Sequence, residues 1–456
     1  MKIFTLKKTN FNQFVVLTQI VLLMVYLSLN ILNVGGAGTG LPLLAGFVTL
    51  ACGALLFDIA RRRSAVHVHF FVFLLFVAWL TFRVVVDLQD AERLKQLTVA
   101  TTSGVLVFFL IGTFARRALD KIVFAEKCVW AKVLLILVLL VNVYIFLVFK
   151  ERLMDRDDII YMEAIEGGYQ RPGSFMIMLF IMSSLIYLGI AAHGHTRNLT
   201  KLLFWLAVYT WVMVLNLMAS QMMGSNAATA CILVMYLMTA VVSVLFVNKV
   251  FRKQYLDNLL NLPFSMYGFN RILKYSVLAL LFGICAALVV IKVTGFDLQK
   301  TRIFGFGAGE NTSVNSRLEI LVESAADQMG HSPFFGNLDV ARLTTGDAGL
   351  TLHSFIPNVI AELGLVGLLI VVLLFVLVMV KLINLMRRCV KNEFGFMQAS
   401  LSFWAFLIFI FLFLYANLAV GKEWSVMWFF LGFAISVFCE QSGHQKRQTL
   451  KRECGA

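Results

Sequence analysis

Arginine, histidine and glutamate side chains in the second half of this chain, with one arginine earlier, have the types and spacing that could do chemistry. A guanidinium group stays charged and offers a planar fork of N–H donors, which suits it to binding anionic groups such as phosphates. A histidine titrates near neutral pH and can accept a proton from a hydroxyl group. The candidates for anion binding are Arg171, Arg317 and Arg342, with Arg302 as an alternative to Arg342; those for proton transfer are His353 and Glu362.

The spacing of the last two residues bears on how they could cooperate. His353 and Glu362 are nine residues apart, which corresponds to about two to three helical turns. Glu362 could orient the imidazole or serve as an alternative base, and direct contact between them would need a bend near Pro357. A second histidine, His331, directly follows the helix-ending Gly330 and is interpreted as structural.

These residues must be positioned by helices that lie in a membrane. Hydrophobic residues make up 60% of the 456 residues and charged residues 14%, whereas a soluble domain has about 45–50% and about 25%. This composition excludes a soluble enzyme, a disordered protein and a fibre. The continuous apolar runs, with only 5 Pro, favour membrane helices over the alternating strands of a β-barrel.

The lengths of the apolar runs predict the number of helices. A membrane-crossing helix needs about 20 apolar residues, so we expect an all-α integral membrane protein with about twelve transmembrane helices. The fourth and twelfth spans are short. The expected spans are 11–33, 41–59, 66–86, 97–114, 128–149, 174–192, 202–220, 227–247, 275–294, 355–383, 397–418 and 424–439.

The basic residues predict the orientation. Lys and Arg concentrate at both ends of the chain and in alternate connections, such as the run 61–63, and the positive-inside rule then places both termini in the cytoplasm. The net charge of +14 fits this topology and attraction to anionic lipid, so nucleic-acid binding is not expected. Residues 1–294 would hold helices 1–9, 295–354 a large periplasmic loop, 355–440 helices 10–12 and 441–456 a basic cytoplasmic tail.

The large outer loop has the pattern of a folded segment. A loop this long in a compact protein is usually functional or disordered. Ser316 and Glu319 form a capping-box pattern, after which apolar residues recur at helical spacing. Gly330 and Pro333 are expected to end this helix. The loop should therefore contain one amphipathic helix, lying on the membrane or over a cavity.

The stretch from Ser316 to Gly367 resembles the shared C-terminal motif of the O-antigen polymerase (Wzy) and O-antigen ligase (WaaL) superfamily. In that motif an Arg opens a loop helix. Pro, two hydrophobic residues and Gly follow, then a His-Asn or His-Ser pair, then an acidic-x-Gly-x-x-Gly entry into the next span. The matching residues here are Arg317, Pro333-Phe334-Phe335-Gly336, His353-Ser354 and Glu362-Leu363-Gly364-Leu365-Val366-Gly367.

Two further elements of the resemblance are weaker. Family members carry an Arg-x-x-Gly-x-Phe-like element where an outer loop enters a span, and here residues 171–175 (RPGSF) have that place with one residue fewer before the Gly. Many members also have Ser-Arg-Gly-Ala after a mid-chain span, where this chain has 224–228 (GSNAA). The Arg is missing, so that phosphate contact of the family is not carried over.

The resemblance implies a GT-C-type glycosyltransferase in the bacterial inner membrane with its active site facing the periplasm. Its donor would be an undecaprenyl-pyrophosphate-linked oligosaccharide, and it would invert the anomeric centre without a metal, a nucleotide sugar or another cofactor. Arg317, Arg171 and Arg342 would bind the pyrophosphate, and His353 would deprotonate the acceptor with Glu362 as its partner or substitute. The glycines after Glu362 would allow close helix packing. Expected partners are membrane lipids and a chain-length regulator protein.

Three functions remain open at this point. The first choice is a polymerase of O-antigen or capsule repeat units, and the alternative is a ligase that transfers the glycan to lipid A–core. The missing Arg near Asn226 slightly disfavours the ligase. A lipid-linked oligosaccharide flippase or another transporter also has twelve spans with both termini inside. Facilitator transporters, however, have their long loop inside between spans six and seven, whereas this chain has it outside between spans nine and ten.

Overall fold

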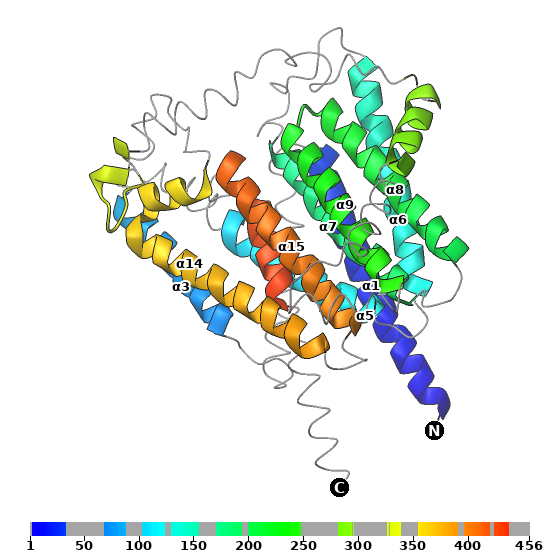
Figure 1. The fold of residues 1–456 in the computed structure, drawn as a ribbon, viewed down its shortest axis with the longest axis horizontal. Helices are drawn as coiled ribbons and strands as arrows, with labels where there is room; N and C mark the ends of the chain where they lie inside the picture. Colours follow the sequence, from blue (N-terminus) through cyan, green and yellow to red (C-terminus); the bar gives the residue numbers. More distant parts are fainter. Residues whose placement is uncertain are drawn as a thin grey trace, which may run out of the picture. The chain divides into compact units, whose positions relative to one another are not determined.

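The computed structural model is helical in the part of the chain that it describes (Figure 1). It describes residues 2–32, 68–87, 103–123, 129–154, 170–193, 199–247, 281–293, 295, 326–327, 329–338, 354–390, 396–419 and 424–436, and these residues contain no strand. Seven helices among them are long and apolar enough to cross a membrane. The predicted class, an α-helical membrane protein with several spans, is therefore confirmed.

The seven candidate spans coincide with predicted ones, and shorter apolar helices coincide with three others. The shorter ones are Val16–Leu32 within α1 (Lys2–Leu32), Leu281–Val293 and Ser425–Ser436. The predicted span 41–59 lies outside the described residues. The long helices are α3 (Val68–Asp87), α6 (Val129–Met154), α7 (Gln170–His193), α8 (Leu199–Met222), α9 (Asn226–Val247), α14 (Phe355–Val390) and α15 (Phe396–Ala419).

The fourth predicted span differs in its boundaries. A π-helical turn, η1 (Ser103–Val107), leads into α5 (Phe108–Val123), which continues well past the predicted end at residue 114. The helix can extend through Arg116 because that side chain is buried and its guanidinium lies 5.4 Å from the centre of the Phe433 ring. A cation over an aromatic face keeps a favourable partner without water.

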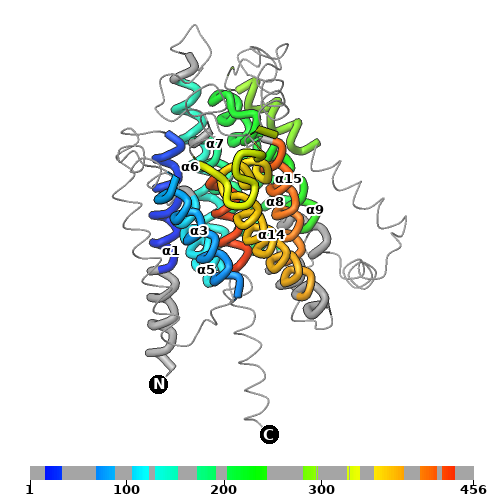
Figure 2. Tube along the Cα trace, turned by 90° about the vertical axis from the view of Figure 1, so that its left-hand side faces the viewer, coloured from blue at the N-terminus to red at the C-terminus, as the bar shows by residue number. Residues whose placement is uncertain are grey.

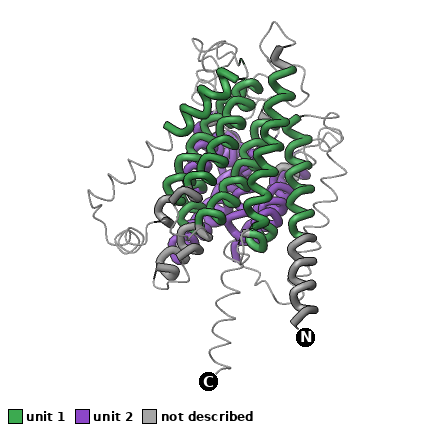
Figure 3. Tube along the Cα trace, turned by 90° about the vertical axis from the view of Figure 1, so that its right-hand side faces the viewer, with its two compact units in different colours: residues 1–46, 117–309, 385–408 green, residues 47–116, 310–384, 409–456 purple. Residues whose placement is uncertain are grey.

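The chain divides into two compact units, which are coloured separately in Figure 3. Unit 1 comprises Met1–Gly46, Arg117–Gly309 and Leu385–Ile408, and unit 2 comprises Phe47–Arg116, Glu310–Asn384 and Phe409–Ala456. In unit 1, α7 packs against α1, α6, α8 and α9. Every residue from Pro172 to Ala191 is buried, so α7 is the central helix of this unit.

A stack of tyrosines forms a polar core in unit 1. The rings of Tyr187 and Tyr209 are parallel with centres 4.6 Å apart, and Tyr236 stacks on Tyr209 at 5.5 Å. Each hydroxyl has a hydroxyl partner: Tyr187 with Ser243 at 3.1 Å, Tyr209 with Ser184 at 2.6 Å, and Tyr236 with Thr210 at 2.8 Å. Polar groups inside a helical membrane protein are expensive unless paired, so these partners explain how the tyrosines are tolerated.

Unit 2 is built on aromatic packing and one antiparallel helix pair. The ring centre of Trp428 lies 4.9 Å from that of Phe76 and 6.2 Å from that of Phe355. Helices α3 and α14 run antiparallel, because Trp79 contacts Leu363 while His69, a few turns earlier, contacts Leu377. The two helices lie close together in the views of Figures 1 and 2. This pair positions the motif described next.

Candidate functional site

Helix α14 is interrupted at Gly364, inside the acidic-x-Gly-x-x-Gly element. Gly364 has φ 68° and ψ −173°, a region that is essentially restricted to glycine. The bend therefore lies at Gly364, whereas direct His353–Glu362 contact would have needed one near Pro357. Pro357 sits in the first turn of α14, where a proline is tolerated because the N–H it lacks would have no partner within the helix.

The loop segment 333–338, which we call the 333–338 turn, fills the interruption. A break in a helix leaves backbone donors and acceptors without their usual partners, which is costly in a membrane protein. The turn supplies those partners through its own backbone. The bonds run from Asn337 N to Ala361 O (2.9 Å), from Leu365 N to Pro333 O (2.9 Å) and from Val366 N to Phe334 O (3.2 Å).

Two glycines make this close approach possible. Gly336 has φ 72°, and a Cβ atom there would collide with the backbone of Glu362 and Leu363. A Cβ atom at Gly364 would collide with the backbone of Phe334 and Gly336. Gly336 and Gly364 thus serve the contact between a turn and a broken helix, whereas helix–helix packing was expected for Gly364. The Pro-Phe-Phe-Gly and acidic-x-Gly-x-x-Gly elements lie directly against each other.

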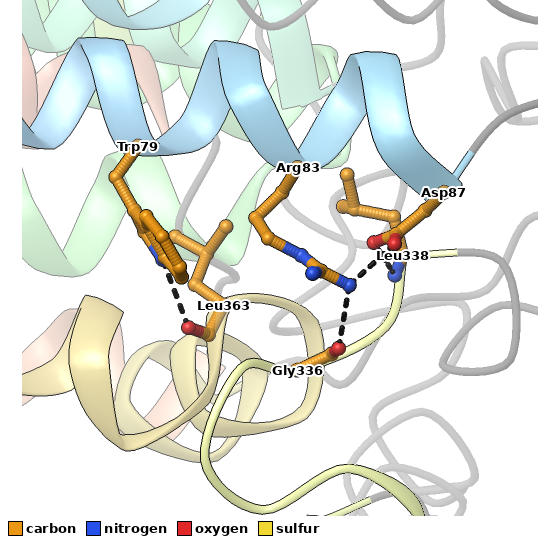
Figure 4. Close-up of polar contacts among 6 residues, drawn as sticks. All are labelled: Trp79, Arg83, Asp87, Gly336, Leu338 and Leu363. Atoms are coloured by element: carbon orange, nitrogen blue, oxygen red, sulfur yellow. Dashed lines mark hydrogen bonds and ion pairs between the residues drawn. The ribbon is translucent and has the colours of Figure 1, made fainter.

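Three side chains of α3 hold the turn and the break together (Figure 4). Arg83 donates from Nη2 to the carbonyl oxygen of Gly336 at 2.7 Å and forms an ion pair with Asp87. Asp87 Oδ2 accepts a hydrogen bond from the backbone N–H of Leu338 at 2.9 Å. The side chains of Arg83 and Asp87 are only 10% and 4% exposed, so this pair acts as a buried clamp on the turn.

Trp79, the third side chain, reaches the break itself. Its indole Nε1–H donates to the carbonyl oxygen of Leu363 at 3.0 Å, directly before the interruption at Gly364. A Cβ atom at Gly367 would collide with the Cβ of Leu363 at 2.3 Å, and it would lie 3.4 Å from Trp79 Nε1.

Trp79, Arg83 and Asp87 are not among the site residues predicted from the sequence. A signal was present: an arginine inside an apolar span is expensive and usually functional or paired, and Asp87 follows Arg83 at the i,i+4 spacing of a helical ion pair. Their target, the carbonyl of Gly336, lies far away in the chain and leaves no mark in the pattern of α3.

Glu362 is fully buried just before the interruption. Its Oε1 accepts a hydrogen bond from Asn358 Nδ2 at 2.8 Å, and Asn358 N in turn donates to Ser354 O at 3.0 Å. These contacts orient the carboxyl group along the first turns of α14. Because the carboxyl group has no exposed surface, a bulky sugar cannot reach it directly in this conformation.

The start of α14 is fixed by the end of α15. Ser354 Oγ donates to the carbonyl oxygen of Asn417 at 2.8 Å, and Asn417 Oδ1 accepts from Ile356 N at 3.0 Å. The amide side chain of Asn417 therefore satisfies one of the orphan N–H groups of the helix N-terminus. His353 itself lies outside the described residues, but its neighbour Ser354 is held in place by these bonds.

The two weaker motif elements also meet, in unit 1. A Cβ atom at Gly173 would lie 2.6 Å from Ser225 Oγ and 3.4 Å from the Cβ of Ala228, so the start of α7 packs closely on the start of α9. Gly224, with φ 71°, forms the tight turn between α8 and α9. Arg171 is the second residue of α7, and its side chain lies outside the described part.

The structure describes some of the predicted site residues and not others. Arg302, Arg317, Arg342 and His353 lie outside the described residues. His331 is exposed at the end of a helical segment that continues through Gly330. No family model, curated protein or solved structure matches the chain. Function is therefore inferred from the residues and their contacts.

Proposed function

We propose that this protein is a glycosyltransferase of the bacterial inner membrane that polymerises polyprenyl-pyrophosphate-linked O-antigen or capsule repeat units. The proposal includes a GT-C-like architecture of twelve spans, with both termini cytoplasmic and the active site facing the periplasm. One observation carries it. Two elements of the superfamily motif, Pro-Phe-Phe-Gly and acidic-x-Gly-x-x-Gly, are far apart in sequence yet bond to each other through their backbones, as expected if they form one functional unit.

The proposed reaction is an inverting transfer. The hydroxyl oxygen of the non-reducing sugar of a single lipid-linked repeat attacks the anomeric carbon of the growing chain, from the face opposite the pyrophosphate. The bond between that carbon and the phosphate oxygen breaks, and the lipid pyrophosphate leaves with the electron pair. Arg317, Arg171 and Arg342 stabilise the charge that develops on it, as fixed cations do in a transition state. The hydroxyl proton passes to His353.

The contacts of Glu362 favour a supporting role for it. A general base must come within hydrogen-bonding reach of the proton that it accepts, and Glu362 is fully buried and bonded to Asn358. His353 precedes the first turn of α14, where Ser354 and Asn417 fix the backbone. We therefore assign proton transfer to His353 and the orientation of this helix start to Glu362 and Asn358.

The transport alternative is disfavoured by the way the break is bonded. In transporters with discontinuous helices, unwound backbone carbonyls line an ion or substrate site. Here the carbonyls of Ala361 and Leu363 accept from Asn337 and Trp79, and the amides of Leu365 and Val366 donate to the 333–338 turn. These contacts with the turn and with α3 favour a structural role for the break over an ion site.

A deletion strain tests the proposal, with its lipopolysaccharide separated on a gel. Loss of a polymerase leaves core that bears a single repeat, and restoration of the gene restores the ladder of longer chains. Bare core with accumulated lipid-linked polymer would instead indicate a ligase. An unchanged ladder, in a strain whose glycan cluster is otherwise intact, would contradict both activities.

A further inference from the structure

The 333–338 turn presents two aromatic side chains to its surroundings. Phe334 is 65% exposed and Phe335 is 55% exposed, although the backbone that carries them is bonded to α14 and clamped by α3. The Phe335 ring lies 6.2 Å from Trp79, and Trp79 stacks on Phe82 at 5.6 Å. The exposed phenylalanines therefore continue an aromatic surface of α3. Their position is fixed by the backbone, so a loop movement of low cost would not bury them.

This aromatic surface is continuous with the apolar faces of two candidate membrane spans. On α3, Leu75, Phe82 and Val86 are exposed, and together with Trp79 they follow the spacing of one helix face. On α14, Leu365, Leu369 and Leu373 are exposed at intervals of four residues. Helices of this length and hydropathy expose such faces to lipid. The turn thus extends a lipid-facing surface at the N-terminal end of α14.

The positions of the charged residues around the turn are also consistent with a turn that faces lipid. Arg83 and Asp87 are directed inward to the backbone of the turn (Figure 4) and are nearly fully buried. The exposed polar residues, Asp327 and His331, precede the turn in sequence. Among the described residues of this loop, the exposed charged and imidazole side chains therefore lie on the N-terminal side of Phe334.

We propose that the 333–338 turn is inserted into the bilayer interface, with Phe334 and Phe335 touching acyl chains of the leaflet at the N-terminal end of α14. Irregular backbone is tolerated at membrane depth only where protein satisfies its polar groups, which is the condition that the hydrogen bonds to α14 meet. Aromatic side chains are also the residue type enriched at this depth. The segment expected to lie in the periplasm would thus re-enter the membrane surface.

Photolabelling of the wild-type protein tests this insertion without any assay of activity. The full chain is reconstituted into liposomes of phosphatidylcholine and phosphatidylglycerol that contain a phosphatidylcholine with a diazirine in its acyl chain. After illumination, peptide mass spectrometry should find adducts on residues 334–335 as well as on Leu369, and few on Asp327 and His331. A water-soluble diazirine should give the opposite pattern.

Adducts on residues 334–335 from the water-soluble reagent alone would overturn the proposal. Adducts from neither reagent, while Leu369 is labelled by lipid, would also overturn it, because another part of the protein would then cover the turn.

A second measurement does not depend on the reactivity of phenylalanine. Nitroxide labels are placed by Phe335→Cys, His331→Cys and Leu369→Cys in the full chain with its native cysteines replaced by serine. The label at 335 should collide with oxygen more than with a water-soluble nickel chelate, as the label at 369 should. If it behaved like the label at 331, the turn would lie in water and the proposal would be wrong.

Discussion

Replacing Arg83 by Ala should release the 333–338 turn from the interruption in α14. The substitution removes the hydrogen bond to the Gly336 carbonyl and the ion pair with Asp87. It also leaves the Asp87 carboxylate, only 4% exposed, without its counter-charge and hydrogen-bonded to the backbone N–H of Leu338. Removal of one member of a buried ion pair costs about 3–5 kcal/mol, because the other charge stays buried without compensation.

Hydrogen exchange can measure this cost at the turn itself. If exchange occurs through local opening, a loss of about 3–5 kcal/mol raises the exchange rate of the affected amides by about 10²- to 10⁴-fold. The informative amides are those of Asn337, Leu338, Leu365 and Val366, which bond across the contact. Mass spectrometry of the peptides around 329–338 and 360–368 would follow them in the reconstituted protein.

Two variants control this experiment. Asp87→Asn keeps an oxygen that can accept from Leu338, but it leaves the Arg83 guanidinium, only 10% exposed, without its counter-charge. It should therefore raise the exchange of the same amides, at a similar cost of about 3–5 kcal/mol. Lys381→Ala removes an exposed basic residue from the same unit, on α14, and should leave both peptides unchanged. If the two peptides of Arg83→Ala exchanged at wild-type rates in an otherwise folded protein, Arg83 would not hold the turn.

Substitutions at three more positions, Gly364, Arg317 and His353, are informative. Gly364→Ala should lower the free energy of unfolding by at least about 1–3 kcal/mol, because the φ of Gly364 disfavours a side chain and the added Cβ would collide with Phe334. Thermal unfolding in detergent should show this loss. The control Gly330→Ala, where an added Cβ meets nothing, should unfold like the wild type. Arg317→Lys should lose much of the polymerising activity, because Lys keeps the charge but not the bidentate geometry, and Arg317→Ala nearly all; full-length polymer from an inserted Arg317→Ala protein would exclude its role. His353→Gln should slow turnover by about 10²- to 10⁴-fold from mildly acidic to mildly basic pH, with donor binding retained. Near-normal turnover would exclude His353 as the base.

Sequence patterns predicted a helix of this protein well where the length and hydropathy of an apolar run determine its ends. Helices α3 and α9 match the predicted spans 66–86 and 227–247 closely, because an apolar run of about 20 residues has few alternatives in a membrane. α5 fits less well. Its amphipathic second half stays helical beyond residue 114, and the pairing of Arg116 with Phe433 that helps it cannot be seen in a local window of sequence.

In the candidate site, too, the features set by local sequence were predicted and those set by distant segments were not. The motif residues at 333–336 and 362–367 could be identified from the sequence, and the structure places them in contact. The position of the break could not be identified from the sequence, because a helix can kink at Pro357, Gly364 or Gly367. The break lies at Gly364 because Gly336, from a distant segment, packs against that residue. The clamp by Arg83 and Asp87 was missed for a similar reason, since its acceptor belongs to another segment.

Turnover by the purified protein tests the proposed function most directly. The protein is reconstituted into liposomes with polyprenyl-pyrophosphate-linked repeat units and a metal chelator, and both glycan length and released polyprenyl pyrophosphate are measured. We predict a ladder of longer lipid-linked glycans, with one polyprenyl pyrophosphate released for each new linkage. Repeat units that neither lengthen nor release polyprenyl pyrophosphate, in a preparation whose 333–338 turn is protected from hydrogen exchange, would contradict the proposal.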